Sequence, residues 1–396
     1  MAASTAAAVL YTAAISTPTQ VLAPEDVEGK AHHAKGGGFQ NPWDSWHLIP
    51  AWAILSKLIA RRFKGEANIP DTTPPTVPVR SPKFLPTRAT GKLRATWLGH
   101  ACYYVEFPGG LRVLFDPVFE DRCSPFSWLG PKRYTEMPCT VEDIPFIDAV
   151  VISHNHYDHL SYPTIKQIHK RHPNCQFFAP LGNKQWFTAS GIHNVTELDW
   201  WEEREFVLSP SGDVIKAIAA ENSLDNPPNI SARIGCLPCQ HISARTLWDR
   251  SNTLWASWSV ESGQSKVYFA GDTGYRSVPD LPNGVDDYGP DHDYPHCPAF
   301  AQVGQYRGPF TLGLIPIGAY DPRYIMSPMH ANPHDAVNIF QDTRCERALG
   351  MHWGTWVLTE EDVMEPPKKL KEALVKNNLA GVGVFDVCDI GESREF

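Results

Sequence analysis

Apolar and polar residues alternate along the chain in a way that predicts a strand-rich domain. Residues 94–107 alternate like strands, and residues 111–115 return after a Pro-Gly-Gly turn at 108–110. Period-two alternation around a Gly-rich turn is typical of a hairpin. Residues 147–152, Ile-Asp-Ala-Val-Val-Ile, form a short and mainly apolar run, which is typical of a buried strand. We therefore expect the main domain to begin near Leu93.

Further strand-like and helix-like segments follow in both halves of the chain. We predict helices over 162–172, 333–342 and 368–377. We predict strands over 176–179, 196–201, 213–219, 253–260, 266–270, 312–317, 347–351 and 381–386. Two strand-rich halves with intervening helices favour an α/β fold, a four-layer αββα sandwich with the sheets inside. Nearly every unusual polar residue follows a predicted strand, so we expect the chemistry on one rim of the sheets.

The segment before residue 93 differs from this domain. Residues 1–38 are rich in small residues and end in three glycines, and we expect a disordered tail there. Residues 39–92 are expected to form an extension, with an amphipathic helix after Pro50 and a Pro- and Thr-rich linker over 71–86. Residues 93–396 would then be the catalytic domain.

The predicted helix of the extension has one apolar face. Trp52, Leu55, Ile59 and Phe63 recur at three- or four-residue steps. Basic residues flank this face: Lys57, Arg61, Arg62 and Lys64. Such a pattern suits a helix lying on a membrane surface. It equally suits a helix packed on the protein's own core or on a second subunit, so the sequence leaves these readings open.

Composition narrows the class of protein. An apolar content of 42% and a charged content of 20% fit a soluble globular protein. The net charge of -9 argues against a general nucleic-acid binder. No apolar run reaches the roughly 18 residues of a transmembrane helix, and the lack of Lys or Arg before Lys30 argues against a targeting peptide. The 9 cysteines are scattered, which favours reduced thiols and an intracellular protein.

The most concentrated chemistry lies in residues 153–160. This segment follows the buried strand and places His154, His156, Asp158 and His159 within six residues. Zinc prefers imidazole nitrogen and carboxylate oxygen at about 2.0–2.2 Å, and structural zinc sites more often use cysteine. The pattern therefore indicates a catalytic metal site with open positions for water. A His-rich polar surface loop is the alternative.

Further residues can complete a metal cluster, and they are His241, Asp272, His330 and His352. Asp272 lies in a Gly-flanked turn, where glycine lets the backbone approach closely. A lone histidine is more often an ordinary polar residue than a ligand. Their shared position at predicted strand ends favours one common site.

The motifs resemble those of the metallo-β-lactamase superfamily: His-x-His-x-Asp-His, a later histidine, Gly-Asp-Thr-Gly and a final histidine. A longer series of blocks resembles the N-acylphosphatidylethanolamine-hydrolysing phospholipase D family within it. These blocks are 97–101, 130–134, 152–160, 198–202, 270–275, 315–320, 352–355 and 391–394. The resemblance runs from about residue 39 to the C-terminus. The first motif is specific only to the superfamily, whereas the series of blocks is much more specific.

The resemblance implies two zinc ions (Zn2+). Seven residues would supply the ligands: His154, His156 and His241 for the first zinc, Asp158, His159 and His352 for the second, and Asp272 as the bridge. The implied catalytic residues are Asp158, Asp272 and His330, of which His330 matches a histidine near the reacting phosphate. Tyr162 and Tyr275 match substrate-binding positions at the mouth of the site.

The implied reaction is hydrolysis of N-acylphosphatidylethanolamine to N-acylethanolamine and phosphatidic acid. A metal-bridging hydroxide would attack phosphorus. The expected partner is a phospholipid at a membrane surface, with peripheral association on the cytosolic face and no nucleic acid. The family also suggests a homodimer.

Other functions fit parts of the pattern. Lactonases and other phosphodiesterases, including RNA-processing nucleases, share the His-x-His-x-Asp-His element, although the net charge of -9 argues against a nuclease. A lipid-binding protein without activity is a further alternative, against which all seven expected ligands argue. Residues 279–305 are longer than the family pattern, so a reshaped substrate entrance or an interface is expected there.

Overall fold

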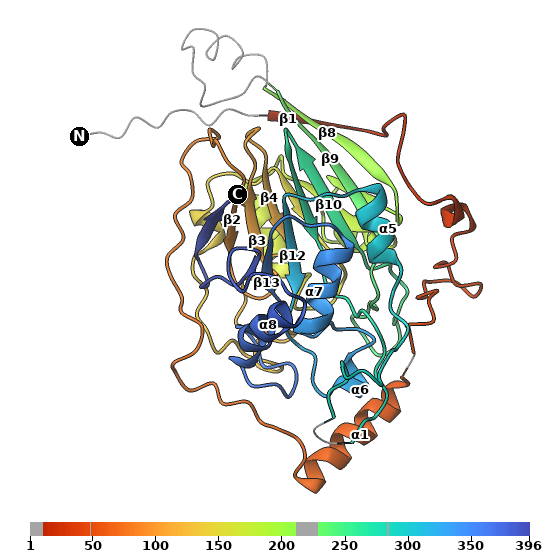
Figure 1. Cartoon of the computed structure of the whole chain (residues 1–396). Helices are drawn as coiled ribbons and strands as arrows, with labels where there is room; N and C mark the ends of the chain where they lie inside the picture. The colour runs from red at the N-terminus through yellow and green to blue at the C-terminus, as the bar shows by residue number, and fades with distance from the viewer. Residues whose placement is uncertain (1–10, 48, 211–228, 283–284) are drawn as a thin grey trace.

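The computed structural model describes residues 11–47, 49–210, 229–282 and 285–396, whose strands form two sheets (Figure 1). One sheet has eight strands in the order β1 (Tyr11–Ser16), β8 (Glu203–Pro210), β9 (Ile230–Leu237), β10 (Ser257–Ser262), β11 (Ser265–Phe269), β12 (Leu312–Pro316), β13 (Ala348–Met351) and β14 (Phe385–Asp386). The other has seven strands in the order β15 (Ser393–Glu395), β2 (Arg94–Trp97), β3 (Tyr103–Glu106), β4 (Arg112–Phe115), β5 (Ala149–Val151), β6 (Gln176–Pro180) and β7 (Val195–Leu198).

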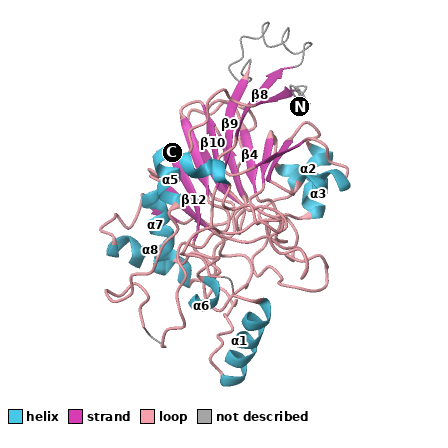
Figure 2. Ribbon diagram, turned by 90° about the vertical axis from the view of Figure 1, so that its right-hand side faces the viewer, coloured by secondary structure: helices cyan, strands magenta, loops and turns pink. Residues whose placement is uncertain are grey.

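Helices cover the outer face of each sheet (Figure 2). The seven-stranded sheet is flanked by α2 (Tyr162–Arg171) and α3 (Lys184–Ala189), and the eight-stranded sheet by α5 (Ala299–Tyr306), α7 (Pro333–Asp342) and α8 (Glu365–Lys376). The other helices within the described residues are η1 (Glu25–Gly29), α1 (Ala51–Lys64), η2 (Val141–Asp143) and α6 (Arg323–Met326). This arrangement confirms the predicted four-layer αββα sandwich.

Each sheet contains a parallel half, and this half positions the site. β4, β5, β6 and β7 run parallel, as do β11, β12, β13 and β14. The helices α2, α3, α5 and α7 lie in the crossovers between successive parallel strands. Within each half, the carboxyl ends of the strands therefore meet at one edge of the sheet.

Aromatic and branched side chains fill the space between the sheets. Phe115 and Phe269 meet across it with ring centroids 4.8 Å apart, and Trp97 stacks on Trp353 at 5.3 Å. All three residues of β5 are buried, as its continuous apolar sequence predicts. Burial of one such large apolar side chain contributes about 1.5–3 kcal/mol.

The N-terminal segment differs from its prediction. Residues 11–38 were expected to be a disordered tail, but Tyr11–Ser16 pairs antiparallel with β8 as an edge strand. Further along, Asp199 accepts hydrogen bonds from Lys30 Nζ (2.8 Å), His32 Nε2 (2.7 Å) and His33 Nε2 (2.8 Å). The expectation is therefore wrong for residues 11–38, because long-range pairing orders a segment whose local sequence carries little signal. The predicted strand over 213–219 lies outside the described residues.

The extension has the predicted helix and the predicted linker. The helix α1 spans Ala51–Lys64, as the apolar spacing indicated, and residues 71–86 contain no helix or strand beyond an isolated bridge at Val79. Within the described ranges, no helix combines the length and the apolar content that a membrane span requires.

Candidate metal centre

Loops at the strand ends bring together five of the predicted histidine ligands and two aspartates. His154 to His159 follow β5, His241 follows β9, Asp272 follows β11 and His352 follows β13. Both sheets therefore contribute. The cluster opens into a cavity of about 510 Å³, which His156, Asp158, Asp272 and His330 line.

The first group of candidate ligands contains three histidines. His154 Nε2 lies 2.8 Å from His156 Nδ1, and His241 Nε2 lies 3.4 Å from the same atom. His154 and His241 are fully enclosed. The resemblance assigned these three residues to one zinc ion, and the structure brings them together.

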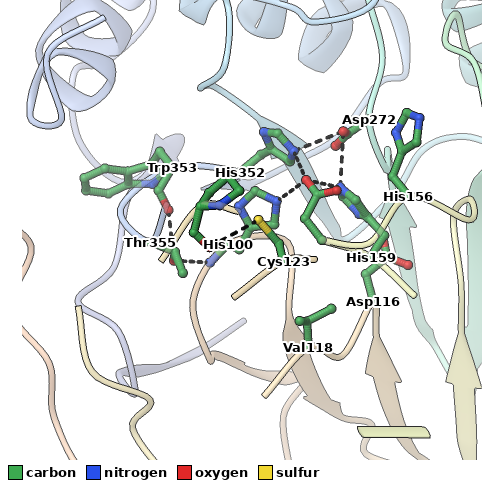
Figure 3. A network of polar contacts seen from close by, with 12 residues as sticks. His100, Asp116, Val118, Cys123, His156, His159, Asp272, His352, Trp353 and Thr355 are labelled. Atoms are coloured by element: carbon green, nitrogen blue, oxygen red, sulfur yellow. Dashed lines mark hydrogen bonds and ion pairs between the residues drawn. The ribbon is translucent and has the colours of Figure 1, made fainter. Parts of the chain in front are cut away.

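The second group lies beside the first. Asp158 Oδ2 is 3.3 Å from His159 Nε2 and 3.5 Å from His352 Nε2. His100, which the sequence did not mark as a candidate ligand, belongs to the same group. Figure 3 shows the imidazoles of His159, His352 and His100 clustered beside Asp272.

Asp272 connects the two groups. Its Oδ2 lies 3.0 Å from His352 Nε2 and 3.2 Å from His159 Nε2 in the second group (Figure 3). The same oxygen lies 3.9 Å from His154 Nε2 and 3.8 Å from His241 Nε2 in the first group. One carboxylate is therefore central to both groups, as a bridging ligand requires.

The donor atoms are arranged to bind metal ions rather than to form hydrogen bonds with one another. Both carboxylate oxygens of Asp272, and the Nε2 atoms of His159 and His352, are buried without a hydrogen-bond partner. A buried polar atom left in this way costs about 1–3 kcal/mol. Tetrahedral ligands of zinc, at bond lengths of about 2.0–2.2 Å, lie about 3.3–3.6 Å apart. The spacing around Asp272 is close to this range, so the residues present are consistent with a metal site.

Neighbouring groups fix the orientation of three rings. His154 Nδ1 lies 2.8 Å from Ser153 Oγ, and His241 Nδ1 donates to the main-chain oxygen of Met329 at 2.9 Å. His159 Nδ1 donates to an Asp116 oxygen at 2.6 Å (Figure 3). In each case the Nε2 atom is left for the centre of the cluster. Such outer contacts fix the tautomer and orientation of a metal-binding histidine.

The buried carboxylates of the cluster favour positive charge on the groups beside them. Burial alone would lower the pKa of His352, but the Asp272 and Asp158 carboxylates raise it to about 9. Burial likewise opposes the charge on His159, yet Asp272 and Asp158 hold its pKa well above the usual range. Burial would raise the pKa of Asp272, but His159 and His352 keep it well below its usual value. Protons on these rings balance the carboxylates in the way that metal cations would.

Two residues that support the cluster were missed from the sequence. His100 Nε2 donates to Asp158 Oδ2 at 2.9 Å, and burial lowers the pKa of His100 to about 3, so the ring is neutral. The backbone of His100 is held by Thr355 Oγ1 (2.7 Å) and by His352 N (2.9 Å). Asp116 accepts from Ser153 N and from His159 Nδ1. Both follow strands, which is the signal that marks the other site residues.

The remaining candidate residues lie at different distances from the cluster. His330 lines the cavity, its Nδ1 is 3.9 Å from Asp272 Oδ2, and burial lowers its pKa to about 4. Tyr162 is half exposed and lines an adjacent cavity of about 610 Å³. Tyr275 is buried, and its hydroxyl donates to Asp342 at 3.0 Å. The expectation that Tyr275 lines the mouth is therefore wrong, because its ring fills the core beneath α5 and α7.

Comparison with known proteins identifies the superfamily. A family model described as "Beta-lactamase superfamily domain" matches residues 111–353. This range contains all seven ligands that the resemblance implies. The chain belongs to the metallo-β-lactamase superfamily.

Within this superfamily the chain has named relatives. It is 35% identical over 371 residues to the "N-acyl-phosphatidylethanolamine-hydrolyzing phospholipase D 1" of Caenorhabditis elegans, covering 90% of this chain and 92% of that protein. It is 33% identical over 278 residues to the mitochondrial protein of corresponding name from Saccharomyces cerevisiae, covering 70% of this chain and 50% of that protein. Among solved structures, a metallo hydrolase from Ignicoccus hospitalis is 18% identical and covers 77% of this chain and 98% of that one, at a TM-score of 0.48. The family model, the named relatives and the grouped candidate ligands together support a metal-dependent hydrolase of this superfamily.

Proposed function

We propose that this hydrolase is a zinc-dependent phosphodiesterase of the phospholipase D type, which cleaves N-acylphosphatidylethanolamine into N-acylethanolamine and phosphatidic acid. The observation that carries the proposal is the pair of ligand groups joined by Asp272 at the floor of an open cavity. Similarity to two proteins named for this reaction supports the choice of substrate.

The candidate ligands would bind two zinc ions. His154, His156 and His241 would hold one zinc ion, and Asp158, His159 and His352 the other, with Asp272 between them. When bound, the two ions would lower the pKa of water and stabilise negative charge on the phosphoryl oxygens.

The protein's own contribution is to bind and orient the phosphodiester. His330 lines the cavity on the side of Asp272. Its imidazole can donate a hydrogen bond to a phosphoryl oxygen, which stabilises charge that develops as the phosphodiester bond breaks. Burial of the histidines around it excludes water from the rest of the cluster.

The surface beside the cavity supports a lipid substrate. Arg61 Nη2 bonds to Glu360 at 2.6 Å, and Lys57 Nζ lies 4.2 Å from the centre of the Tyr324 ring. These contacts hold two basic residues of α1, Lys57 and Arg61, against the protein, while Trp52 and Phe63 are 74% and 89% exposed. An apolar helix face directed away from the core suits insertion into a membrane surface. We therefore propose peripheral binding to phospholipid membranes, with α1 as one contact.

Product analysis by mass spectrometry tests the proposal. Purified protein loaded with zinc would be incubated with N-acylphosphatidylethanolamine in mixed micelles, with and without a chelator. We expect N-acylethanolamine and phosphatidic acid in equal amounts, and no products with the chelator. Asp272→Asn should lower turnover at least about 1,000-fold, because it removes the shared ligand charge.

The outcomes separate the proposal from its alternatives. No cleavage by protein that holds two zinc ions would exclude this substrate and favour a lactonase or another phosphodiesterase. Full activity of Asp272→Asn would exclude the two-metal arrangement. Protein that binds vesicles but no zinc would favour a lipid-binding role.

A further inference from the structure

The insertion at residues 279–305 contacts the helices α6, α7 and α8, and its Asp280 pairs with Lys57 of α1 at 3.7 Å. Asp286 pairs with Lys376 at the end of α8 at 3.2 Å, and the ring of Tyr288 lies 4.8 Å from that of His334 in α7. Asp287 bonds to Arg323, the first residue of α6. None of the described residues of the insertion lines the cavity over the candidate metal ligands. Its contacts therefore do not support the expectation of a reshaped entrance at that cavity.

Asp287 belongs to a buried quartet of charges. Its Oδ2 accepts from Arg276 Nη2 (3.2 Å), Arg323 Nε (3.1 Å) and Arg323 Nη2 (2.9 Å). Asp335 accepts from the same two arginines, at 3.3 Å from Arg276 Nε and 2.8 Å from Arg323 Nη2. The four side chains are at most 15% exposed. Two positive and two negative charges balance, so none is left unpaired in a poorly solvated region.

Tyr288, which belongs to the insertion, contacts two members of the quartet. The guanidinium of Arg276 lies 3.6 Å from the centre of the Tyr288 ring, and the Tyr288 hydroxyl donates to Asp335. The insertion thus supplies one charge, one hydroxyl and one aromatic face to residues that lie outside it.

Both arginines belong to segments that carry the metal centre. Arg276 lies four residues after Asp272. Arg323 begins α6, and at the other end of α6 the Met326 oxygen accepts from His330 N at 2.8 Å.

The segment after α6 contacts the centre directly. The oxygen of Met329 accepts from His241 Nδ1 at 2.9 Å, and Ala331 N donates to Thr273 O at 2.6 Å. A displacement of α6 would therefore move both His330 and the acceptor that orients His241.

We propose that Asp287 is a positioning residue for the reaction at the metal centre. It holds α6 against the loop that carries Asp272, and so fixes His330 over the cavity and the ring of His241 beside it. Its influence on turnover rests on the proposed function, whereas its hold on α6 can be measured without a lipid substrate. Small displacements of a positioned group lower turnover strongly.

Asp287→Asn in the full-length, zinc-loaded protein tests the proposal, with Asp286→Asn as the matched control. Asp286 is the neighbouring residue, and its pair with Lys376 is exposed. For Asp287→Asn we expect kcat to fall about tenfold, KM to change less than about twofold, and bound zinc to stay constant. Amide hydrogen exchange over residues 326–331 should become at least about tenfold faster. Asp286→Asn should leave all four quantities close to wild type.

Measuring kcat with two substrates distinguishes a failure of this inference from a failure of the proposed function. kcat would be measured with N-acylphosphatidylethanolamine and with bis(p-nitrophenyl) phosphate, a soluble phosphodiester. If the wild type cleaves neither, the proposed function fails, and the exchange rates alone decide whether Asp287 holds α6. Wild-type kcat and exchange in Asp287→Asn would overturn the inference, as would a loss of kcat that only follows lost zinc or lost folded protein.

A second variant covers the case in which Asp287→Asn fails to fold. Tyr288→Phe removes only the hydroxyl that donates to Asp335. We expect a fall in kcat of about threefold and faster exchange in the same segment, with KM and zinc unchanged. Unchanged kcat and exchange in Tyr288→Phe would then overturn the inference.

Discussion

His100 shows how much one neutral imidazole matters at the scale of a residue. It donates to the Asp158 oxygen that faces His159 and His352. Loss of a group that holds a ligand usually lowers metal affinity about 10–100-fold. We expect this loss in His100→Ala, measured by competition with a chromogenic chelator and by zinc content after dialysis. His100→Gln retains an N–H donor and should retain more affinity. Equal affinity in wild type, His100→Ala and the surface control His193→Ala would contradict the role.

Asp199 anchors the N-terminal segment through one carboxylate. Burial would raise its pKa, but hydrogen bonds from His32 and Lys30 hold the pKa well below its usual value. A carboxyl group with a lowered folded-state pKa stabilises the protein above its unfolded pKa of about 3.9, and this stabilisation is lost as pH falls through the folded-state pKa. Asp199→Asn should therefore destabilise the protein by about 3 kcal/mol at neutral pH.

Denaturant unfolding of both proteins between pH 3 and pH 8 measures this effect. The difference in unfolding free energy should be constant above about pH 5 and should shrink below about pH 4. A difference that grows as the pH falls would show that the carboxylate is not the stabilising form.

At the scale of elements, the sequence predicted the helices and strands whose formation depends on residues close to one another in the chain. The helix α7 has the predicted bounds, because Asn332 caps it with a hydrogen bond from Asp335 N and Pro333 occupies the first turn. β1 was missed, because a run of Ala, Thr and Ser acquires its extended state only by pairing with β8. β8 was missed as well, since the charged residues Glu203, Arg204 and Glu205 open it and break the apolar pattern.

The candidate site likewise contains residues that local sequence patterns reveal and contacts that they do not reveal. The candidate ligands of the His-x-His-x-Asp-His loop could be located in the sequence because their spacing and the preceding strand are local features. The contact between His100 and Asp158 spans 58 positions in the sequence, so no spacing reveals it. The resemblance located Tyr275 along the chain but gave no information on the direction of its ring, which points toward Asp342.

The helix α1 yields a prediction of its own. Its apolar face is directed away from the protein, and each large apolar side chain that enters a membrane contributes up to about 1.5–3 kcal/mol. Leu55→Asp combined with Phe63→Asp should lower the fraction bound to phospholipid vesicles at least about tenfold, measured by co-sedimentation. Turnover of a soluble phosphodiester should be unchanged. Val375→Asp, at a 70% exposed apolar residue of α8, is the control.

The result also separates the two readings that the sequence left open. If the double variant binds vesicles normally but changes from dimer to monomer in light scattering, the apolar face of α1 is a subunit interface.

At the scale of the whole molecule, the metal centre joins the two sheets. The first ligand group combines His154 and His156, after β5 of the seven-stranded sheet, with His241, after β9 of the eight-stranded sheet. The second combines Asp158 and His159 with His352, after β13. Metal ions at these positions would therefore connect the halves of the sandwich and neutralise carboxylates that are buried between them.

Removal of the bound metal should consequently destabilise the entire fold rather than one loop. A ligand at about 1,000 times its dissociation constant stabilises the native state by about 4 kcal/mol. For a chain of 396 residues, the unfolding entropy is about 0.8 kcal/mol/K, so a chelator should lower Tm by about 5 °C. Calorimetry of zinc-loaded and chelated protein measures the shift as one transition. In Asp272→Asn the shift should be smaller, because the shared ligand charge is lost. A Tm unchanged after verified loss of zinc would mean that the sheets hold the centre in place without help from the metal.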